Sequence, residues 1–567
     1  MLPLKLGRIV LFGLVTSLLG VQASAQTPPR TPLRSPTNGP WQKPGFFPIA
    51  VWYQQANSTG HSGRYATLAA AAAASRINVF LGQGADWPEN YGADNGEIEA
   101  IQQNGLYLIG GIAVPSTENS SAHSVSSILA LAHGAGADAN LIGYNAGDEP
   151  QCDARGLSSM AAVPTVVSDI TKYDPTRIVT FNQTDWMIQP EWQHNPTGCL
   201  ASDQTALHAV SVASFDYYPE TSPYIASQLN VTGSDFKSVG NDSLWVQGLS
   251  VQALAKFALP GQPLWAYVEA GGDNFGLSEV NNVLSGSVAG GSTTLVNASG
   301  RSSFTESWLG LAVSGTAIPS GTTIVGVIDA THATMSRSAT GTSSGSITVG
   351  SGPLGDCVVG VNLCVVNGNE YRPTPAQVSA EVWMSIINGA TGIEYFCHDA
   401  TSYSFCLGDS GAGGAAATAT QVNLSRVDRA VLSRAEVLNA PTSGICSMQQ
   451  FNYTTGVASI ATSCSNGVLS MATRNPAVPG MALAKSYDGA TYLFAQSDRR
   501  SPSGADFTFG LAGLAGHPAT VIFDTNSRYD RAHTSHGKTF TLDGSGGFTD
   551  TLGANHNDYQ VKIYRID

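Results

Sequence analysis

Short apolar segments alternate with helical segments along most of this 567-residue chain, and this alternation constrains the fold more than any other feature. An apolar run of strand length followed by an alanine-rich or amphipathic stretch is typical of a β-strand and its return helix. Eight successive strands predict a (β/α)8 barrel, and an open doubly wound sheet is the alternative. The predicted strands are 47–53, 77–81, 106–114, 141–149, 177–182, 210–217, 264–269 and 392–397. The predicted helices are 64–76, 96–104, 125–133, 158–173, 251–258, 375–388 and 422–438.

The predicted barrel, residues 45–440, is interrupted after its seventh strand. From 284 to 352 the sequence is rich in Gly, Ser, Thr and Val and alternates with a period of two. Because structureless loops of that length are rare, we expect a small all-β insertion. This insertion begins after the carboxyl end of strand seven, so it either contacts a substrate or lies on the barrel without a role in substrate binding. Its segment Ala317–Ile324 resembles repeats in phage tail and surface-adhesin proteins.

The last part of the chain, residues 441–567, lacks helical periodicity. Short alternating segments are separated there by Gly, Asp, Asn and Ser turns, which predicts a C-terminal β-sandwich. Such a domain either binds carbohydrate or packs on the barrel, and packing is the favoured role. The strands expected in it are 468–471, 482–485, 492–496, 520–524, 539–542 and 560–566.

The N-terminus has the order of a signal peptide. Lys5 and Arg8 precede an apolar run over 9–21, which small residues follow at 23–25. This order predicts a signal peptide over 1–25 and a secreted protein, periplasmic or extracellular. Residues 26–44, rich in Pro, Thr, Ser and Arg, are expected to form a flexible leader. No other stretch approaches 18 apolar residues, so no membrane association is expected after cleavage.

The charge balance and the cysteines exclude several classes of partner. The net charge of -14 argues against nucleic acid or an anionic membrane. The chain has eight cysteines, an even number, without the CxxC clusters of a zinc site. In an exported protein they predict disulfides. The expected pairs are Cys152–Cys199, Cys357–Cys364, Cys397–Cys406 and Cys446–Cys464.

Two predicted strands end in a glutamate. The fourth strand runs into Asp148, Glu149 and then a proline, which ends the strand because it cannot donate to the ladder. The seventh ends at Glu269, before an Ala-Gly-Gly turn. In a parallel barrel the carboxyl ends of the strands carry the catalytic groups, so we expect Glu149 and Glu269 to face each other across the mouth. The alternatives are that Glu149 caps the next helix and that Glu269 pairs with a core arginine.

A pair of carboxyl groups is what glycosidic bond hydrolysis requires, one to protonate the leaving oxygen and one to attack or to activate water. The chain has no Walker loop, no GxGxxG after the first strand and no HExxH motif, and we expect no cofactor or metal. This pair of strand-end glutamates, with a Glu-Pro step at the fourth strand, resembles the clan A glycoside hydrolases. The resemblance implies a retaining β-glycosidase acting on poly- or oligosaccharide, with Glu149 as acid/base and Glu269 as nucleophile.

The residue before the acid/base departs from that family, which usually has Asn there to meet the sugar 2-hydroxyl. Here it is Asp148, and a carboxylate accepts hydrogen bonds but cannot donate one. Asp148 remains a candidate for binding that hydroxyl, with a different sugar specificity. A like charge beside Glu149 also raises the proton affinity of one of the two groups, which suits a general acid.

Substrate-binding candidates lie at other strand ends. The resemblance implies a Tyr or His near the nucleophile on strand six, which is either Tyr217 or Tyr218. It also implies an aromatic floor on strand eight, where Phe396 followed by His398 is a partial match. Aromatic rings stack on apolar sugar faces, although core packing is the alternative for each ring. By residue type we add Trp52 and Trp186 for stacking, and Gln54, Asn182 and Gln183 for binding hydroxyls.

Rival functions are a transglycosylase on the same barrel and a non-catalytic glycan-binding protein of a cell surface or phage, which the adhesin-like insertion suggests. The tetrapeptide at 408–411, GDSG, also occurs around the nucleophile of trypsin-like proteases. Those proteases also have an upstream Ala-Ala-His-Cys motif and a Gly-Pro step after the tetrapeptide, and this chain has neither. We therefore interpret Ser410 as a chance match.

Overall fold

The computed structural model describes the chain in the following ranges. They are residues 39–52, 65–82, 97–111, 120–149, 159–183, 199–218, 244–270, 282–298, 304, 312–329, 331–350, 364–366, 370–372, 375–396, 407, 414–452, 457–475, 478–498, 503–525, 535–554 and 559–567. The predicted signal peptide lies outside them.

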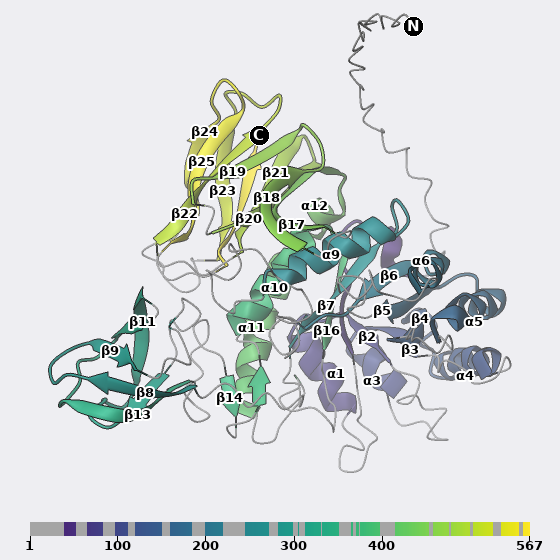
Figure 1. The fold of residues 1–567 in the computed structure, drawn as a ribbon. Helices are drawn as coiled ribbons and strands as arrows, with labels where there is room; N and C mark the ends of the chain where they lie inside the picture. Colours follow the sequence, from purple (N-terminus) through teal and green to yellow (C-terminus); the bar gives the residue numbers. More distant parts are fainter. Residues whose placement is uncertain are drawn as a thin grey trace, which may run out of the picture.

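Eight strands form a closed barrel in which every strand pairs in parallel with both neighbours (Figure 1). The barrel closes because β1 pairs with both β2 and β16. This confirms the predicted (β/α)8 fold and excludes the open doubly wound sheet. In barrel order the strands are β1 (Ile49–Trp52), β16 (Gly392–Phe396), β7 (Leu264–Glu269), β6 (Val212–Phe215), β5 (Ile178–Gln183), β4 (Leu141–Asp148), β3 (Tyr107–Gly111) and β2 (Val79–Leu81).

Helices follow the strands and cover the outside of the barrel. One was not predicted: α6 (Cys199–Ala209) has several polar residues of modest helix propensity, and it is held by packing against α5. The helix predicted over 422–438 is two helices, α11 and α12. The helices are α1 (Tyr65–Ala74), α3 (Glu97–Gln103), α4 (Ser120–Gly134), α5 (Ser159–Tyr173), α6, α9 (Val246–Phe257), α10 (Pro375–Ile387), α11 (Gly414–Leu432) and α12 (Ala435–Asn439).

The barrel interior is filled by the inward-facing half of each strand. Side chains alternate between the two faces of a strand, so apolar residues inside pack on one another while their neighbours pack under the helices. At the N-terminal end of the barrel, Trp265 fills so much space that a Cβ on Gly392 would lie 2.5 Å from its ring. The buried apolar residues of the interior are Ala50, Trp52, Val79, Leu81, Ile109, Ile142, Ile178, Val212, Trp265 and Tyr267.

Residues 39–44, which the composition assigned to the flexible leader, are ordered against this end of the barrel. They include a short 3₁₀ helix, η1 (Pro40–Gln42). The ring of Trp41 lies 5.9 Å from that of Trp265 and 5.4 Å from that of Phe46. Contact between large aromatic rings outweighs the local preference of a Pro- and Gly-containing segment for coil.

The insertion after strand seven is a closed antiparallel barrel of six strands, drawn in teal at the left of Figure 1. It has its own apolar core, which includes Leu284, Ile324 and Ile347. The predicted all-β insertion is therefore confirmed. Its strands are β8 (Asn282–Val288), β9 (Thr294–Asn297), β10 (Ala312–Gly315), β11 (Thr322–Asp329), β12 (His332–Met335) and β13 (Ser343–Gly350), and a hairpin of β14 (Cys364–Val366) and β15 (Glu370–Arg372) follows.

The C-terminal segment forms a seven-stranded and a three-stranded antiparallel sheet with an apolar core between them, which confirms the predicted sandwich. The prediction missed β17, β18, β22 and β25, whose alternation is blurred by polar and Gly residues. The seven-stranded sheet has the order β18 (Val457–Cys464), β17 (Thr442–Asn452), β20 (Gly480–Tyr487), β21 (Ala490–Ser497), β26 (Val561–Ile566), β23 (Pro518–Asp524) and β24 (Thr539–Thr541). The other sheet has the order β19 (Leu469–Thr473), β22 (Ser503–Leu511) and β25 (Gly547–Ala554).

The sandwich shares a continuous apolar core with the barrel. The ring of Trp383 on α10 lies 6.3 Å from that of Phe494 and 5.6 Å from that of Phe523. The side-chain amide of Gln496 donates a hydrogen bond of 3.1 Å to the Ala380 carbonyl. Figure 1 shows the sandwich against α9 and α10. The sandwich therefore packs on the barrel, the role that the sequence favoured.

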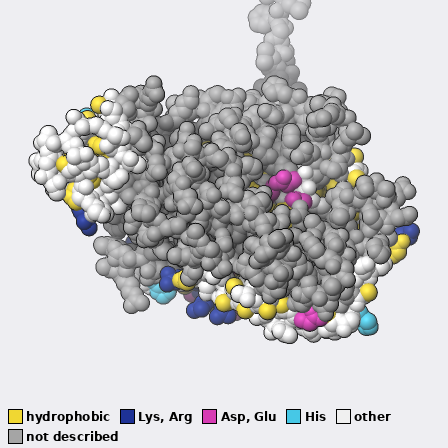
Figure 2. All heavy atoms as spheres, turned by 90° about the horizontal axis from the view of Figure 1, so that it is seen from below, with side chains coloured by type: hydrophobic (Ala, Val, Ile, Leu, Met, Phe, Trp, Pro, Cys, Tyr) yellow, Lys and Arg dark blue, Asp and Glu magenta, His cyan; other side chains and the backbone are white. Residues whose placement is uncertain are grey.

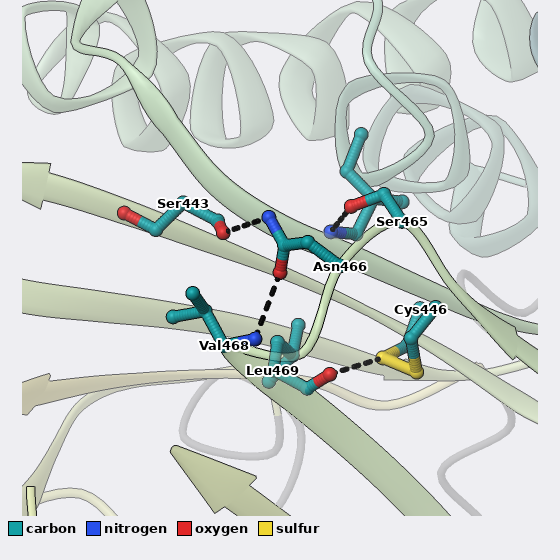
Figure 3. Close-up of a disulfide and its surroundings, with 8 residues drawn as sticks. Ser443, Cys446, Ser465, Asn466, Val468 and Leu469 are labelled. Atoms are coloured by element: carbon teal, nitrogen blue, oxygen red, sulfur yellow. Dashed lines mark hydrogen bonds between the residues drawn. A yellow bond between two sulfur atoms is a disulfide. The ribbon is translucent and has the colours of Figure 1, made fainter. Parts of the chain in front are cut away.

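One of the four expected disulfides lies within the described residues. Cys446 and Cys464 face each other on β17 and β18 with a Cα–Cα distance of 4.1 Å (Figure 3). In the adjoining turn Asn466 donates a hydrogen bond to the Ser443 carbonyl and accepts one from the Val468 backbone (Figure 3). The other three pairs each include a cysteine outside the described residues. No helix in the described part of the chain is both long and apolar enough to cross a membrane.

Candidate active site

The carboxyl ends of the barrel strands bring together polar side chains that are far apart in the sequence. Strand pairing sets Asp148 on β4 beside Asn182 on β5, and Glu269 on β7 beside Phe396 on β16. Glu149 follows β4 directly, so the two predicted catalytic glutamates lie at the same end of the barrel. Figure 2 shows acidic side-chain atoms, in magenta, at the surface near the middle of the face seen from below.

A β-bulge in β4 decides where Asp148 points. Between Asn145 and Asp148 the pairing with β5 slips, and β4 has one residue more than its partner. An extra residue shifts the alternation of side chains by one, so Asp148 turns to the inner face that Asn182 occupies. The Asn182 side-chain amide donates a hydrogen bond of 3.1 Å to Asp148 Oδ1.

Glu149 has a left-handed backbone, with φ of 40°, and an exposed side chain. Its backbone N–H donates a bond of 3.0 Å to the Asn182 carbonyl, so the residue is anchored to β5 as the chain turns. Such a φ is costly for a non-glycine residue and persists where the surrounding structure fixes it. The next described helix, α5, begins only at Ser159, so Glu149 does not flank it as a capping residue does.

Asp216 joins this group from the end of β6. Its Oδ2 accepts a hydrogen bond of 2.9 Å from the Asn182 amide and one of 3.3 Å from the Tyr218 hydroxyl. The side chain of Glu149 interacts with Asp216 by charge and by hydrogen bonding. Asp148 and Asp216 therefore share the Asn182 amide, and Glu149 interacts with Asp216; we call these three carboxyl groups the mouth acids.

Burial and repulsion by neighbouring carboxyl groups raise the pKa of two of the mouth acids, Asp148 and Asp216. Loss of hydration and then the charge of Glu149 raise the pKa of Asp148 from 3.8 to about 7, against the opposing hydrogen bond from Asn182. Asp216 is 3% exposed. Burial, followed by the charge and hydrogen bond of Glu149, raises the Asp216 pKa well above its usual range. A neutral carboxyl group is therefore favoured at Asp216 near pH 7, whereas Asp148 changes its charge in that pH range.

Glu269 is buried at the end of β7. Its backbone N–H donates a hydrogen bond of 3.2 Å to a side-chain oxygen of Glu381 on α10. On the same strand, the Tyr267 carbonyl accepts a bond of 2.6 Å from the Gln247 amide of α9. The end of β7 is thus fixed from behind by two helices, which sets the position of the Glu269 backbone.

Aromatic rings line the inner face beside the acids. Trp52 is 2% exposed, and its ring lies 5.3 Å from that of Tyr267 and 6.2 Å from that of Phe396. The Tyr218 ring stacks on Phe396 at 5.3 Å. Between the two tyrosine candidates, Tyr218 contacts the mouth acids. Tyr217 instead belongs to the core under the helices, where its ring stacks on Phe215 at 6.2 Å, since successive residues face opposite sides.

The remaining candidates divide between the core and the undescribed part of the chain. Gln183 is buried and interacts with Asp203 of α6, outside the barrel, rather than with the mouth acids. Asn182 is buried in the mouth, and its Oδ1 has no hydrogen-bond partner among the described residues. Gln54, Trp186 and His398 lie outside the described residues.

Sequence reasoning did not select Asp216, although it lies near the end of the predicted strand 210–217 as Glu149 lies at the end of 141–149. The same rule, a carboxylate at a strand end, identifies it. Glu394 on β16 is fully buried in the barrel interior, opposite Tyr267 on β7. Burial raises the pKa of Glu394 to about 8, although the nearby hydroxyls of Ser214 and Tyr267 lower it. In the described part of the chain no group of His, Cys, Asp or Glu residues is arranged to hold a metal ion.

Comparison with known proteins gives resemblances of fold only. No family model and no curated protein matches the sequence. A glycoside hydrolase family 5 structure from Bacteroides vulgatus ATCC 8482 matches with a TM-score of 0.42 and 10% identity over 92% of this chain and 89% of that one. A GH42 β-galactosidase from G. stearothermophilus gives 0.44 and 8% over 92% and 98%. An α-L-arabinofuranosidase from Thermotoga maritima gives 0.36 and 10% over 88% and 89%. At such scores the likeness carries no argument, and the fold assignment rests on the strand pairing above.

Proposed function

We propose that this chain is a secreted retaining glycoside hydrolase that cleaves β-linked poly- or oligosaccharide. One observation carries the proposal: Glu149 and Glu269 end strands four and seven of a closed parallel barrel, on the same rim. Barrel enzymes carry out their chemistry at this rim. The buried Trp52 and the partly buried Phe396 and Tyr218 give that rim an aromatic side of the kind that contacts sugar rings.

The proposed reaction uses the buried Glu269 as the nucleophile and the exposed Glu149 as the acid and base. Glu269 attacks the anomeric carbon, the bond to the leaving oxygen breaks, and Glu149 gives its proton to that oxygen. Glu149 is then a carboxylate that removes a proton from water. The water oxygen bonds to the anomeric carbon, and Glu269 leaves as a carboxylate. Asp148 and Asn182, held together by their hydrogen bond, supply polar groups beside the reacting sugar.

The test is sugar release from a panel of β-linked polysaccharides and aryl glycosides. We expect Glu269→Gln to lose on the order of 10³-fold or more in kcat, because the covalent intermediate cannot form. Glu149→Gln should lose about 10²- to 10⁴-fold on substrates with poor leaving groups and much less on activated aryl glycosides, which need no acid.

Asp488→Asn serves as the control. It removes a carboxylate from the exposed turn between β20 and β21 and should leave the rate unchanged. Release by the parent that survives both glutamate substitutions would contradict the assignment of the pair. Binding of a glycan by the parent without any release would favour the glycan-binding alternative. Products lengthened by added acceptor sugars would favour a transglycosylase.

A further inference from the structure

Asp216 is a buried carboxyl group beside Glu149, and the assignment of two catalytic glutamates gives it no task. Asn182 lies between the strands that carry the mouth acids. Its amide nitrogen is 3.1 Å from Asp148 Oδ1 and 2.9 Å from Asp216 Oδ2. An amide NH₂ has two hydrogens, so it can donate to both carboxyl groups at once. The Tyr218 hydroxyl adds a second donor to Asp216 Oδ2.

These bonds leave Asp216 with one oxygen for Glu149. Both hydrogen bonds from Asn182 and Tyr218 end on Oδ2, so among the described residues Oδ1 is the oxygen left for the Glu149 side chain. Two carboxyl groups form a hydrogen bond only if one of them keeps a proton. Asp216 is 3% exposed whereas Glu149 is exposed, so water stabilises a negative charge on Glu149 much better than on Asp216. When the pair holds a single proton, that proton therefore belongs on Asp216.

We propose that Asp216 stays protonated through the reaction and donates a hydrogen bond from Oδ1 to the carboxylate of Glu149. Asp216 is thus a positioning residue: it orients the acid/base and stabilises the carboxylate that Glu149 becomes after protonating the leaving oxygen. Before the first step Glu149 carries a proton of its own, which it gives to the leaving oxygen and regains from water, while the proton on Asp216 is not transferred. This inference rests on the proposed function for its catalytic consequence, but the protonation of Asp216 is testable without it.

The groups that face Asp216 from the neighbouring elements are mainly acids. Asp148 and Glu149 face it from β4, Tyr218 from its own segment, and Tyr267 from β7. Glu269 ends the strand that carries Tyr267, and Glu394 lies opposite Tyr267 on β16. Ionisation of Asp216 at high pH would put a second charge against Glu149 and remove the donor, so activity should fall there.

Asp216→Asn and Asp216→Leu separate the possibilities. Asparagine has the shape of a protonated aspartic acid: its oxygen can accept from Asn182 and Tyr218, and its NH₂ can donate to Glu149. We expect Asp216→Asn to keep an activity close to that of the parent and to lack the fall at high pH. Asp216→Leu should lose on the order of 10²-fold in kcat, the scale of one acid–base contribution. Circular dichroism reports whether each variant is folded.

Equal losses in the Asn and Leu variants would mean that Asp216 works as an ionised acceptor, and full activity of the Leu variant would remove any role. The matched control is Asp203→Asn, because Asp203 is also 3% exposed and its pKa is also raised by burial, to about 7, but it lies outside the barrel. Its substitution should not change the pH profile.

Infrared spectroscopy of the parent and of Asp216→Asn at pH 7 provides the activity-independent arm. The parent should show a stronger neutral carboxylic acid carbonyl stretch than the variant, because Asp148, Asp203 and Glu394 contribute to this signal in both proteins and Asp216 only in the parent. An unchanged neutral carboxylic acid signal would overturn the inference even in an active enzyme. If the parent releases no sugar, the proposed function fails, while the infrared result still decides the protonation of Asp216.

Discussion

Replacing Asp148 by asparagine should make the protein more stable at neutral pH. Burial and the Glu149 charge raise the pKa of Asp148 from 3.8 to about 7. The folded protein therefore holds a proton that the unfolded chain has already released between these values. Stability falls as the pH rises from about 4 to about 7, because there the folded state binds more protons than the unfolded one.

The size of the effect follows from the shift. At about 1.4 kcal/mol for each pH unit, the shift corresponds to about 4 kcal/mol of lost stability above pH 7. This is an upper value for Asp148→Asn, since Asp148 and Asp216 interact by charge and share the cost. The asparagine Oδ1 can still accept the hydrogen bond from Asn182, so the substitution removes the charge and keeps the contact.

The assay is urea-induced unfolding of the parent and of Asp148→Asn, followed by tryptophan fluorescence at intervals from pH 4 to pH 8. We expect the two free energies of unfolding to be close at pH 4 and to separate by up to about 4 kcal/mol as the pH rises. Asp138→Asn, an exposed carboxylate just before β4, is the control and should run parallel to the parent. A constant difference between Asp148→Asn and the parent at all pH values would refute the reasoning.

Two further predictions concern packing and the disulfide. Gly392→Ala puts a Cβ 2.5 Å from the ring of Trp265 and should lower the free energy of unfolding by about 1–3 kcal/mol. In the control Gly467→Ala the new Cβ has no neighbouring atom within 4 Å, so the thermal unfolding temperature should not change. Equal shifts of the unfolding temperature in the two variants would contradict the role of the Trp265 contact. Replacing Cys446 and Cys464 together by alanine removes the disulfide that closes a loop of 18 residues, and should lower the free energy of unfolding by about 3 kcal/mol. Urea unfolding with and without reductant measures this loss. If the variant is still less stable than the parent when the parent is also reduced, the disulfide is not the cause of the loss.

The sequence was sufficient for the order of the barrel strands and for their carboxyl ends. Each strand is a short apolar run bounded by turn residues, and this signal is local. The same signal places Glu149 and Glu269 at strand ends. It did not reveal α6, whose local propensity is weak and whose stability comes from packing on α5.

The partners of each side chain were not readable from local patterns. Tyr217 and Tyr218 are adjacent and chemically alike, yet one packs under the helices and the other contacts Asp216. Trp52, a stacking candidate, proved to be almost fully buried against Tyr267 and Phe396. Which face a residue presents depends on the register of its strand within the closed barrel, and register is set by contacts between distant segments.

What the sequence by itself determined is a strand-and-helix barrel with an all-β insertion, an all-β tail and a glutamate at the end of two strands. Only the tertiary structure decided which acids meet. The β4 bulge turns Asp148 toward Asn182, and the closed barrel brings Asp216 against Glu149. The physical reason is that hydrophobic periodicity is a property of each segment, whereas the electrostatics of the mouth acids depend on burial and on distances that exist only once the barrel has closed.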